Sequence, residues 1–223
     1  MADTVKYEAV IFDLDGTLLD TLEDLADSMN AVLQQLNFPT HPTEQYRYFV
    51  GDGMRQLARR VLPADAIDDE SMVEITVKLM SAEYNKRWNV KTKPYSGLAE
   101  LLDRLTAIGV KMAVLSNKPD AFTKIMVPAL LSRWSFHPIL GARNGAPIKP
   151  DPQSALDIAG IWGINPDKVL YVGDTGTDML TANAAGMEAV GAAWGFRTVE
   201  ELLTTGARSI VHHPIDIVPL LES

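Results

Sequence analysis

The sequence predicts an α/β fold: a Rossmann-like, doubly wound parallel sheet with a small all-helical cap domain inserted after the first strand. Short apolar runs alternate with segments of helical periodicity along most of the chain, which is typical of right-handed crossovers and a parallel sheet covered on both faces. Between residue 20 and about residue 90 the periodicity is helical, and we find no convincing strand. Polar residues follow three of the predicted strands, where ligands of such sheets bind.

The first strand is predicted from the apolar, partly β-branched run that starts at Ala9 and ends at the paired acids Asp13 and Asp15. Side chains two apart on an extended chain point the same way, so both carboxylates can reach one cleft. One of them could attack a phosphorus atom while the other moves a proton to the leaving oxygen. Taken alone, Asp15-Gly16 could equally be an ordinary turn after a strand.

The cap is predicted to consist of helices alone. Its expected helices cover about residues 22–36, which end before Pro39, then 43–50, 54–62 after the interruption Gly51-Asp52-Gly53, and 71–88. Lys93-Pro94-Tyr95-Ser96-Gly97 suits a boundary because Pro and Gly break regular structure. We therefore expect a catalytic core of residues 1-19 and 92-223 and a helical cap domain of residues 20-91.

The remaining elements of the core follow from the same patterns. Further strands are expected at 110–115, 136–140, 169–172, 188–193 and 209–211. The intervening helices are expected at 98–108, 121–131 (where Pro128 must kink or shorten the helix), 152–158, from about 174 to 185, and 199–203, with a last helical turn at the end.

Composition restricts the function classes. The 223 residues suffice for one sizeable core, with 20 Lys and Arg against 29 Asp and Glu, a formal charge of −9. This acidic balance argues against nucleic acid and against an anionic membrane as partners, since both need clustered basic residues. Cysteine is absent, which excludes disulfides and thiolate metal sites. No apolar run approaches membrane-spanning length and the first residues lack an apolar signal core, so we expect a cytoplasmic protein.

Three further groups suit phosphate chemistry. Ser116 and Asn117 follow the strand that ends at Leu115, and they offer a hydroxyl and an amide to phosphate oxygens. Lys149 precedes a helix and could supply positive charge to a phosphoryl group or to the paired carboxylates. Asp174 and Asp178 follow a third strand and are hard oxygen ligands suited to Mg²⁺. Alone, Ser116-Asn117 could be a turn and Lys149 a surface lysine; only the combination favours a site.

In this order the groups resemble the four motifs of the haloacid dehalogenase superfamily of phosphatases, and the resemblance runs over nearly the whole chain. The motifs are Asp13-Leu14-Asp15-Gly16-Thr17, Leu115-Ser116-Asn117, Lys149-Pro150 and Gly173-Asp174-Thr175-Gly176-Thr177-Asp178. Ser116 stands where many relatives have Thr, and Thr175 where many have Ser; each keeps a hydroxyl. The second acid, Asp15, is absent from the dehalogenases and therefore points to the phosphatases and phosphomutases of the superfamily.

The resemblance implies the following roles. Asp13 is the nucleophile that becomes an aspartyl phosphate, and Asp15 protonates the leaving alcohol and then activates water. Mg²⁺ is held by Asp13, the backbone carbonyl of Asp15 and Asp174, with Asp178 close by or bound through water. Ser116 and Lys149 hold the phosphoryl oxygens, and Thr17 and Asn117 belong to the substrate-binding set.

The cap should choose the substrate, a small phosphorylated metabolite. Its best candidate segment is Val50-Gly51-Asp52-Gly53-Met54-Arg55, where Gly51 lets the backbone approach a ligand and Arg55 could pair with a carboxylate. Equally, the glycines could merely join two helices while Arg55 is exposed. Together with the stretch from Asp13 through Leu33, this segment resembles the phosphoglycolate phosphatase branch, which implies hydrolysis of 2-phosphoglycolate to glycolate and phosphate. A phosphomutase of the β-phosphoglucomutase type and a catalytically silent binding protein are the alternatives, and the oligomeric state, monomer or homodimer, stays open.

Overall fold

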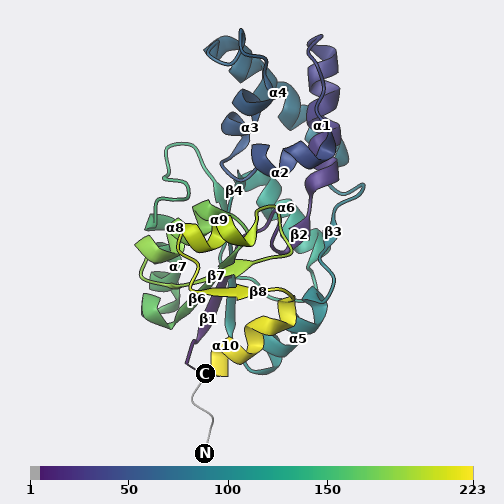
Figure 1. The fold of residues 1–223 in the computed structure, drawn as a ribbon. Coiled ribbons are helices and arrows are strands. Elements are labelled where there is room, and N and C mark those ends of the chain that lie inside the picture. The colour runs from purple at the N-terminus through teal and green to yellow at the C-terminus, as the bar shows by residue number, and fades with distance from the viewer. Residues whose placement is uncertain (1–5, 223) are drawn as a thin grey trace, which may run out of the picture.

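The protein contains a six-stranded parallel sheet with a helical layer beyond one end of it (Figure 1). The computed structural model describes residues 6–222; the expectation drawn from the first residues falls on residues 1–5 and lies outside them. The strand order is β5-β4-β1-β6-β7-β8, and every pairing is parallel. The strands of this sheet are β1 Ala9–Phe12, β4 Lys111–Pro119, β5 Ile139–Ala142, β6 Val169–Gly173, β7 Glu188–Ala192 and β8 Ser209–Val211.

The order confirms the predicted doubly wound fold. From β1 the chain moves outward through β4 to β5, returns across β1 to β6, and continues outward on the other side. Such a reversal leaves a crevice at the carboxyl ends of the two central strands, here β1 and β6. Both motif acids after β1 and the Gly-Asp motif after β6 lie at this end of the sheet.

Strand β1 lies at the centre because it is apolar on both faces. Val10 and Phe12 pack into the hydrophobic cluster on one face, and Ala9 and Ile11 pack into the cluster on the other; all four are fully buried or nearly so. Helices α5 (Leu98–Ala107), α6 (Asp120–Leu130) and α10 (Val218–Glu222) contribute side chains to the first cluster. The opposite face is covered by α7 Gln153–Trp162, α8 Gly176–Ala184 and α9 Val199–Thr204.

The helical layer contains the helices that follow the first motif, as the periodicity predicted. Its largest contact is between α1 and α4, at the upper end of the molecule in Figure 1. A short 3₁₀ turn in this layer covers Thr43–Gln45, and two others, outside the layer, cover Pro166–Lys168 and Pro214–Ile217. The helices of the layer are α1 Leu22–Gln35, α2 Tyr46–Phe49, α3 Met54–Val61 and α4 Glu70–Arg87.

Two short antiparallel strands join the layer to the core. Strand β2 (Leu19–Asp20) pairs with β3 (Lys93–Pro94) where the chain leaves and re-enters the core. Beside this junction the buried Asp24 carboxylate accepts hydrogen bonds from the backbone N–H groups of Lys91 and Thr92 and from the Thr92 hydroxyl. The sequence analysis missed this pair because two-residue strands carry no periodicity.

The structure corrects two strand boundaries. The prediction that the second long strand ends at Leu115 was wrong: β4 continues to Pro119, which pairs with Ala142 of β5 after an irregularity in the register that spans the buried polar residues 116–118. The short strand expected at 136–140 lies at Ile139–Ala142 instead, and Phe136 packs edge-on against Phe12 in the core. Pro128 lies inside α6, and the helix ends two residues after it.

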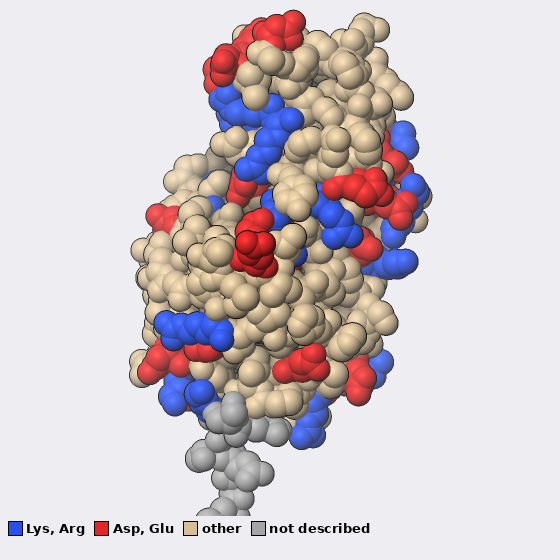
Figure 2. Space-filling view, viewed as in Figure 1, with Lys and Arg blue, Asp and Glu red and all other residues tan. Residues whose placement is uncertain are grey.

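Over residues 6–222, none of the helices is both long and apolar enough to cross a membrane. On the face drawn in Figure 2, Lys and Arg side chains and Asp and Glu side chains form small groups of both signs, among them a basic group directly below an acidic one at the upper left, and other residues cover most of the face.

Candidate active site

Three buried carboxylates meet where β1 and β6 end. One carboxylate oxygen each from Asp13, Asp174 and Asp178 lies within 4.8 Å of the others. Asp174 is fixed by the Thr17 hydroxyl, which donates to its Oδ1 at 2.9 Å, and by the Phe196 backbone N–H, which donates to its Oδ2 at 2.8 Å. The Thr17 hydroxyl, expected among the substrate-binding groups, therefore positions this acid.

Glycine is required beside Asp174. A Cβ on Gly16 would lie 2.2 Å from Asp174 Oδ2, and Gly16 has a positive φ of 89° that side chains disfavour. A Cβ on Gly195 would lie equally close to Asp174 Cβ. These two glycines allow the loops after β1 and β7 to enclose the acid completely.

Asp178 is held at the start of α8. The Thr175 hydroxyl donates to Asp178 Oδ2 at 2.7 Å, and the Thr175 backbone N–H donates to the same oxygen at 3.1 Å. This reciprocal capping arrangement fixes the first turn of the helix. Its other oxygen, Oδ1, faces Lys149 at 2.6 Å.

Lys149 supplies the positive charge of this cluster. Its ammonium Nζ contacts Asp178 Oδ1 at 2.6 Å and Asp13 Oδ1 at 2.9 Å; the second contact is an ion pair without a well-directed hydrogen bond. Burial lowers the pKa of Lys149, but the Asp13 and Asp178 carboxylates outweigh it and raise the pKa well above its usual value. Lys149 is therefore charged throughout the ordinary pH range.

Burial and mutual repulsion favour the neutral, protonated form of the carboxylates. Burial raises the pKa of Asp13 to about 7; Lys149 opposes this increase, whereas Asp178 and Asp15 add to it. Burial also raises the pKa of Asp174, and the charges of Asp13 and Asp178 raise it further. One ammonium thus leaves this group of acids short of positive charge, and their hard oxygen donors fit a cation such as Mg²⁺.

Asn117 links three parts of the site through its side-chain amide. Its Nδ2 donates to the Lys149 carbonyl at 3.0 Å and to the Gly51 carbonyl at 3.1 Å, and its Oδ1 accepts from the Lys149 N–H at 2.9 Å. These bonds occupy the amide that was expected to bind substrate. Ser116, in contrast, keeps its hydroxyl beside the pocket, where it accepts the Lys118 N–H at 3.2 Å.

The sequence analysis missed Lys118. Its ammonium is buried, lies 3.0 and 3.1 Å from the two Asp15 oxygens, and donates to the Tyr84 hydroxyl of α4 at 2.9 Å. Burial lowers the pKa of Lys118, but Asp15 and Tyr84 more than offset this effect and raise it to about 12. The available signal was its place directly after Ser116 and Asn117: the chain stays extended there, and Lys118 lines the pocket together with both of them.

A pocket lies between the core and the helical layer, above these groups. The core contributes Asp13, Asp15, Ser116, Asn117, Lys118 and Pro119, and the layer contributes Leu25, Val50, Gly51, Gly53, Met54 and Leu57. The pocket therefore combines charged groups at its floor with an apolar roof, as small-molecule sites commonly do.

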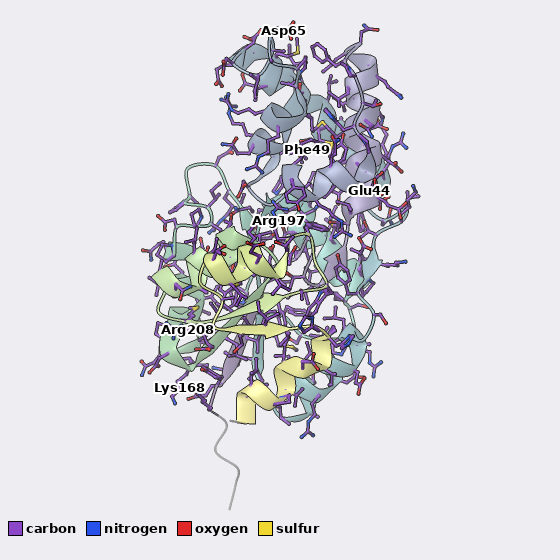
Figure 3. All side chains as sticks on the ribbon, viewed as in Figure 1. Glu44, Phe49, Asp65, Lys168, Arg197 and Arg208 are labelled. Carbon is purple, nitrogen blue, oxygen red and sulfur yellow. The ribbon has the colours of Figure 1, made fainter. Side chains whose placement is uncertain are left out.

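The loop that carries Gly51 rests directly on the core. Thr177 donates its hydroxyl to Asp52 Oδ1 at 2.8 Å, and Arg197 donates Nη2 to the Val50 carbonyl at 2.8 Å. Figure 3 shows Arg197 at the edge of the core that faces the helical layer. These contacts hold the loop of the helical layer at the edge of the pocket.

Arg55 is not brought to the pocket. Its side chain is half exposed and pairs with Glu70 of α4, which Arg59 also contacts. Its neighbour Met54 lines the pocket instead. Helix α3 therefore turns Arg55 to solvent, and among the described residues of the pocket lining the cation is Lys118.

Comparison with known proteins gives one consistent result. Residues 10–192 match the family described as haloacid dehalogenase-like hydrolase. A phosphoglycolate phosphatase of Pseudomonas putida is 35% identical over 191 residues, which cover 84% of this chain and 70% of that protein. A phosphoglycolate phosphatase of Nitrosospira multiformis is 30% identical over 220 residues, which cover 98% and 97%.

Solved structures share the fold. The crystal structure of a predicted phosphoglycolate phosphatase from Haemophilus somnus has a TM-score of 0.87 and 26% identity, covering 96% of this chain and 98% of that one. A subfamily IA hydrolase from Geobacter sulfurreducens has a TM-score of 0.72 and 22% identity, covering 99% of each chain. The second similarity is one of fold alone.

Proposed function

The chain belongs to the haloacid dehalogenase-like hydrolases and is a phosphoric monoester hydrolase, and on this premise we propose that it hydrolyses 2-phosphoglycolate through an aspartyl phosphate on Asp13. The observation that carries this proposal is that Asp13 and Asp15 line the same small pocket. The named relatives support the substrate, since several are phosphoglycolate phosphatases.

In the proposed first step, a carboxylate oxygen of Asp13 attacks phosphorus, and the bond from phosphorus to the leaving oxygen breaks. Asp15 gives its proton to that oxygen, so the product leaves as an alcohol. In the second step, Asp15 takes a proton from water while the water oxygen attacks phosphorus. Inorganic phosphate leaves, and the Asp13 carboxylate is restored.

The phosphoryl oxygens need positive charge and hydrogen-bond donors beside Asp13. Lys149, 2.9 Å from Asp13, and the Ser116 hydroxyl are the proposed contacts. Asp13, Asp174 and the backbone carbonyl of Asp15 would hold Mg²⁺. Asp178 would lie close to the metal without binding it directly, because Lys149 and Thr175 already occupy its two oxygens. When bound, Mg²⁺ reduces the repulsion between the anionic phosphate and the carboxylates.

We further propose that residues 20–91 act as a cap domain that opens and closes over a core of residues 1–19 and 92–223. The chain crosses between the two parts only at β2 and β3, which makes this pair a suitable hinge. Opening would break the bonds from Asn117, Thr177 and Arg197 to the loop at residues 50–52. Closure would exclude water while the ester bond is attacked.

The test is the initial rate of phosphate release with Mg²⁺, comparing kcat/KM for 2-phosphoglycolate with values for sugar phosphates. We expect a strong preference for 2-phosphoglycolate, and loss of turnover in Asp13→Asn with an unchanged circular dichroism spectrum. A preference for a sugar phosphate would contradict the proposed substrate but not the proposed hydrolysis through an aspartyl phosphate. Phosphoryl transfer between sugar hydroxyls without free phosphate would contradict hydrolysis and favour a phosphomutase.

A further inference from the structure

We propose that Lys118 binds the carboxylate of the leaving group, and thereby makes the enzyme select phosphate esters whose alcohol carries an acid. This inference deepens the proposed function and rests on it. It replaces Arg55, the residue that the sequence suggested for the same task.

The first argument is position. Lys118 lines the pocket with Asp15, and 3% of its side chain is exposed. In 2-phosphoglycolate a single carbon separates the ester oxygen from the carboxylate. A cation that contacts Asp15, the proposed proton donor to that oxygen, therefore lies where this carboxylate must sit.

The second argument is donor capacity. An ammonium carries three N–H donors. One donor can serve the Asp15 carboxylate, whose oxygens lie at 3.0 and 3.1 Å, and one serves the Tyr84 hydroxyl at 2.9 Å. The third donor is left for a bound ligand. A charge-assisted bond there would be strong because the side chain is almost completely removed from water.

The third argument is that neighbouring cations are engaged elsewhere. Lys149 pairs with Asp13 and Asp178, on the side of Asp13 where the phosphoryl group is proposed to bind. None of the three arginines above the core lines the pocket: Arg55 binds Glu70, Arg47 binds the Gly195 carbonyl, and Arg197 binds Glu201 and, through Nη2, the carbonyl of Val50. Val50 itself belongs to the lining, and Arg197 Nη1 has no hydrogen-bond partner among the described residues.

Tyr84 makes this selection dependent on cap closure. It lies on α4, is fully buried, and holds Lys118 by its hydroxyl and by its ring, whose centroid is 4.4 Å from Nζ. The hydroxyl also donates to Met126 Sδ at 3.8 Å in the core. Tyr84 is thus a positioning residue: when the cap closes, it places the ammonium against the leaving group.

The experiment compares two esters of similar size. 2-Phosphoglycolate carries the carboxylate, and 2-hydroxyethyl phosphate has a neutral hydroxymethyl group in its place. The readout is the ratio of their kcat/KM values with Mg²⁺, which cancels any loss of Asp15 function common to both. For Lys118→Met we expect this ratio to fall about 10- to 100-fold, as loss of a hydrogen bond to a charged group predicts.

Two further measurements separate binding from folding. Tyr84→Phe keeps the ring and should lower the ratio about 2- to 10-fold, less than Lys118→Met, because it removes one hydrogen bond that positions the ammonium and leaves the ammonium itself in place. It tests the inference even if Lys118→Met fails to fold. Competitive inhibition by glycolate reports on the carboxylate contact without turnover, and it should weaken in both variants.

The outcomes are distinct. A wild-type enzyme with equal kcat/KM for both esters would overturn the proposed substrate, and this inference with it. A wild-type preference that survives in Lys118→Met and Tyr84→Phe would overturn the inference alone. Arg55→Ala is the comparison variant. If it loses the preference for 2-phosphoglycolate while Lys118→Met keeps it, Arg55 binds the carboxylate and our assignment is wrong.

Discussion

Replacing Lys149 by Met should destabilise the protein strongly, because the ammonium is the direct cationic partner of two buried acids. Its Nζ lies 2.6 Å from Asp178 and 2.9 Å from Asp13, and at most 6% of any of these three side chains is exposed. Methionine has a similar volume and no charge, so the substitution removes the pairing with little change in packing. Breaking a buried pair in this way costs about 3–5 kcal/mol.

The loss should depend on pH. Burial raises the pKa of Asp13 to about 7 even with Lys149 present, so removing the ammonium favours the protonated acid further. The stability of wild type stops depending on Asp13 above about pH 7, whereas the variant, whose Asp13 pKa is higher still, continues to lose stability as the pH rises further. We therefore expect the difference from wild type to be larger at pH 8 than at pH 6.

Urea denaturation in EDTA at the two pH values measures this difference. The control is Lys124→Met, which removes the exposed pair between Lys124 and Asp120 and should change the free energy of unfolding by less than about 1 kcal/mol. A Lys149→Met variant that loses no more than this control at pH 8 would refute the argument that the ammonium compensates the acids.

Three other perturbations test separate parts of the site. Adding Mg²⁺ should raise the melting temperature more at pH 8 than at pH 5.5. Because the pKa of Asp13 is raised in the folded protein, the metal-free protein becomes less stable as the pH rises from about 4 towards 7, and a cation bound to the ionised carboxylate offsets this loss of stability. Equal shifts of the melting temperature at the two pH values would contradict this reasoning. Thr177→Val removes the bond to Asp52 and should raise KM by about 2- to 10-fold with the melting temperature nearly unchanged; an unchanged KM would show that this contact does not help closure. Asp24→Ala leaves the N–H groups of Lys91 and Thr92 without an acceptor and should lower the free energy of unfolding by about 1–3 kcal/mol in urea denaturation; a smaller change would mean that water replaces the carboxylate.

The sequence was sufficient to predict the sheet because β1 and β6 are apolar on both faces, which only a central strand of a parallel sheet requires. It was also sufficient to predict that Asp13 and Asp174 lie together, since the carboxyl ends of neighbouring parallel strands share one edge. In each case the pattern lies within a few residues of the chain.

Local sequence patterns did not predict the positions of Lys118 and Arg55 relative to the pocket. The polar residues after Leu115 suggested a loop, whereas the chain there remains extended and brings Lys118 into the pocket lining beside Ser116. Whether Arg55 faces the pocket depends on how α3 is rotated against the core, and Tyr84 reaches Lys118 only because α4 packs over β4's end. Contacts of this kind are set by tertiary packing between segments far apart in sequence.

The central claim is that Asp13 carries the phosphoryl group during turnover. Asp15→Asn should be mixed with acetyl phosphate and Mg²⁺, quenched in acid and digested for mass spectrometry. Acetyl phosphate has a good leaving group, so the first step needs no proton donor, whereas the second step lacks its base. We expect one phosphoryl group to accumulate on the peptide that contains Asp13 and none in the Asp13→Asn, Asp15→Asn double variant. A label on another residue, or no label at all, would contradict the account.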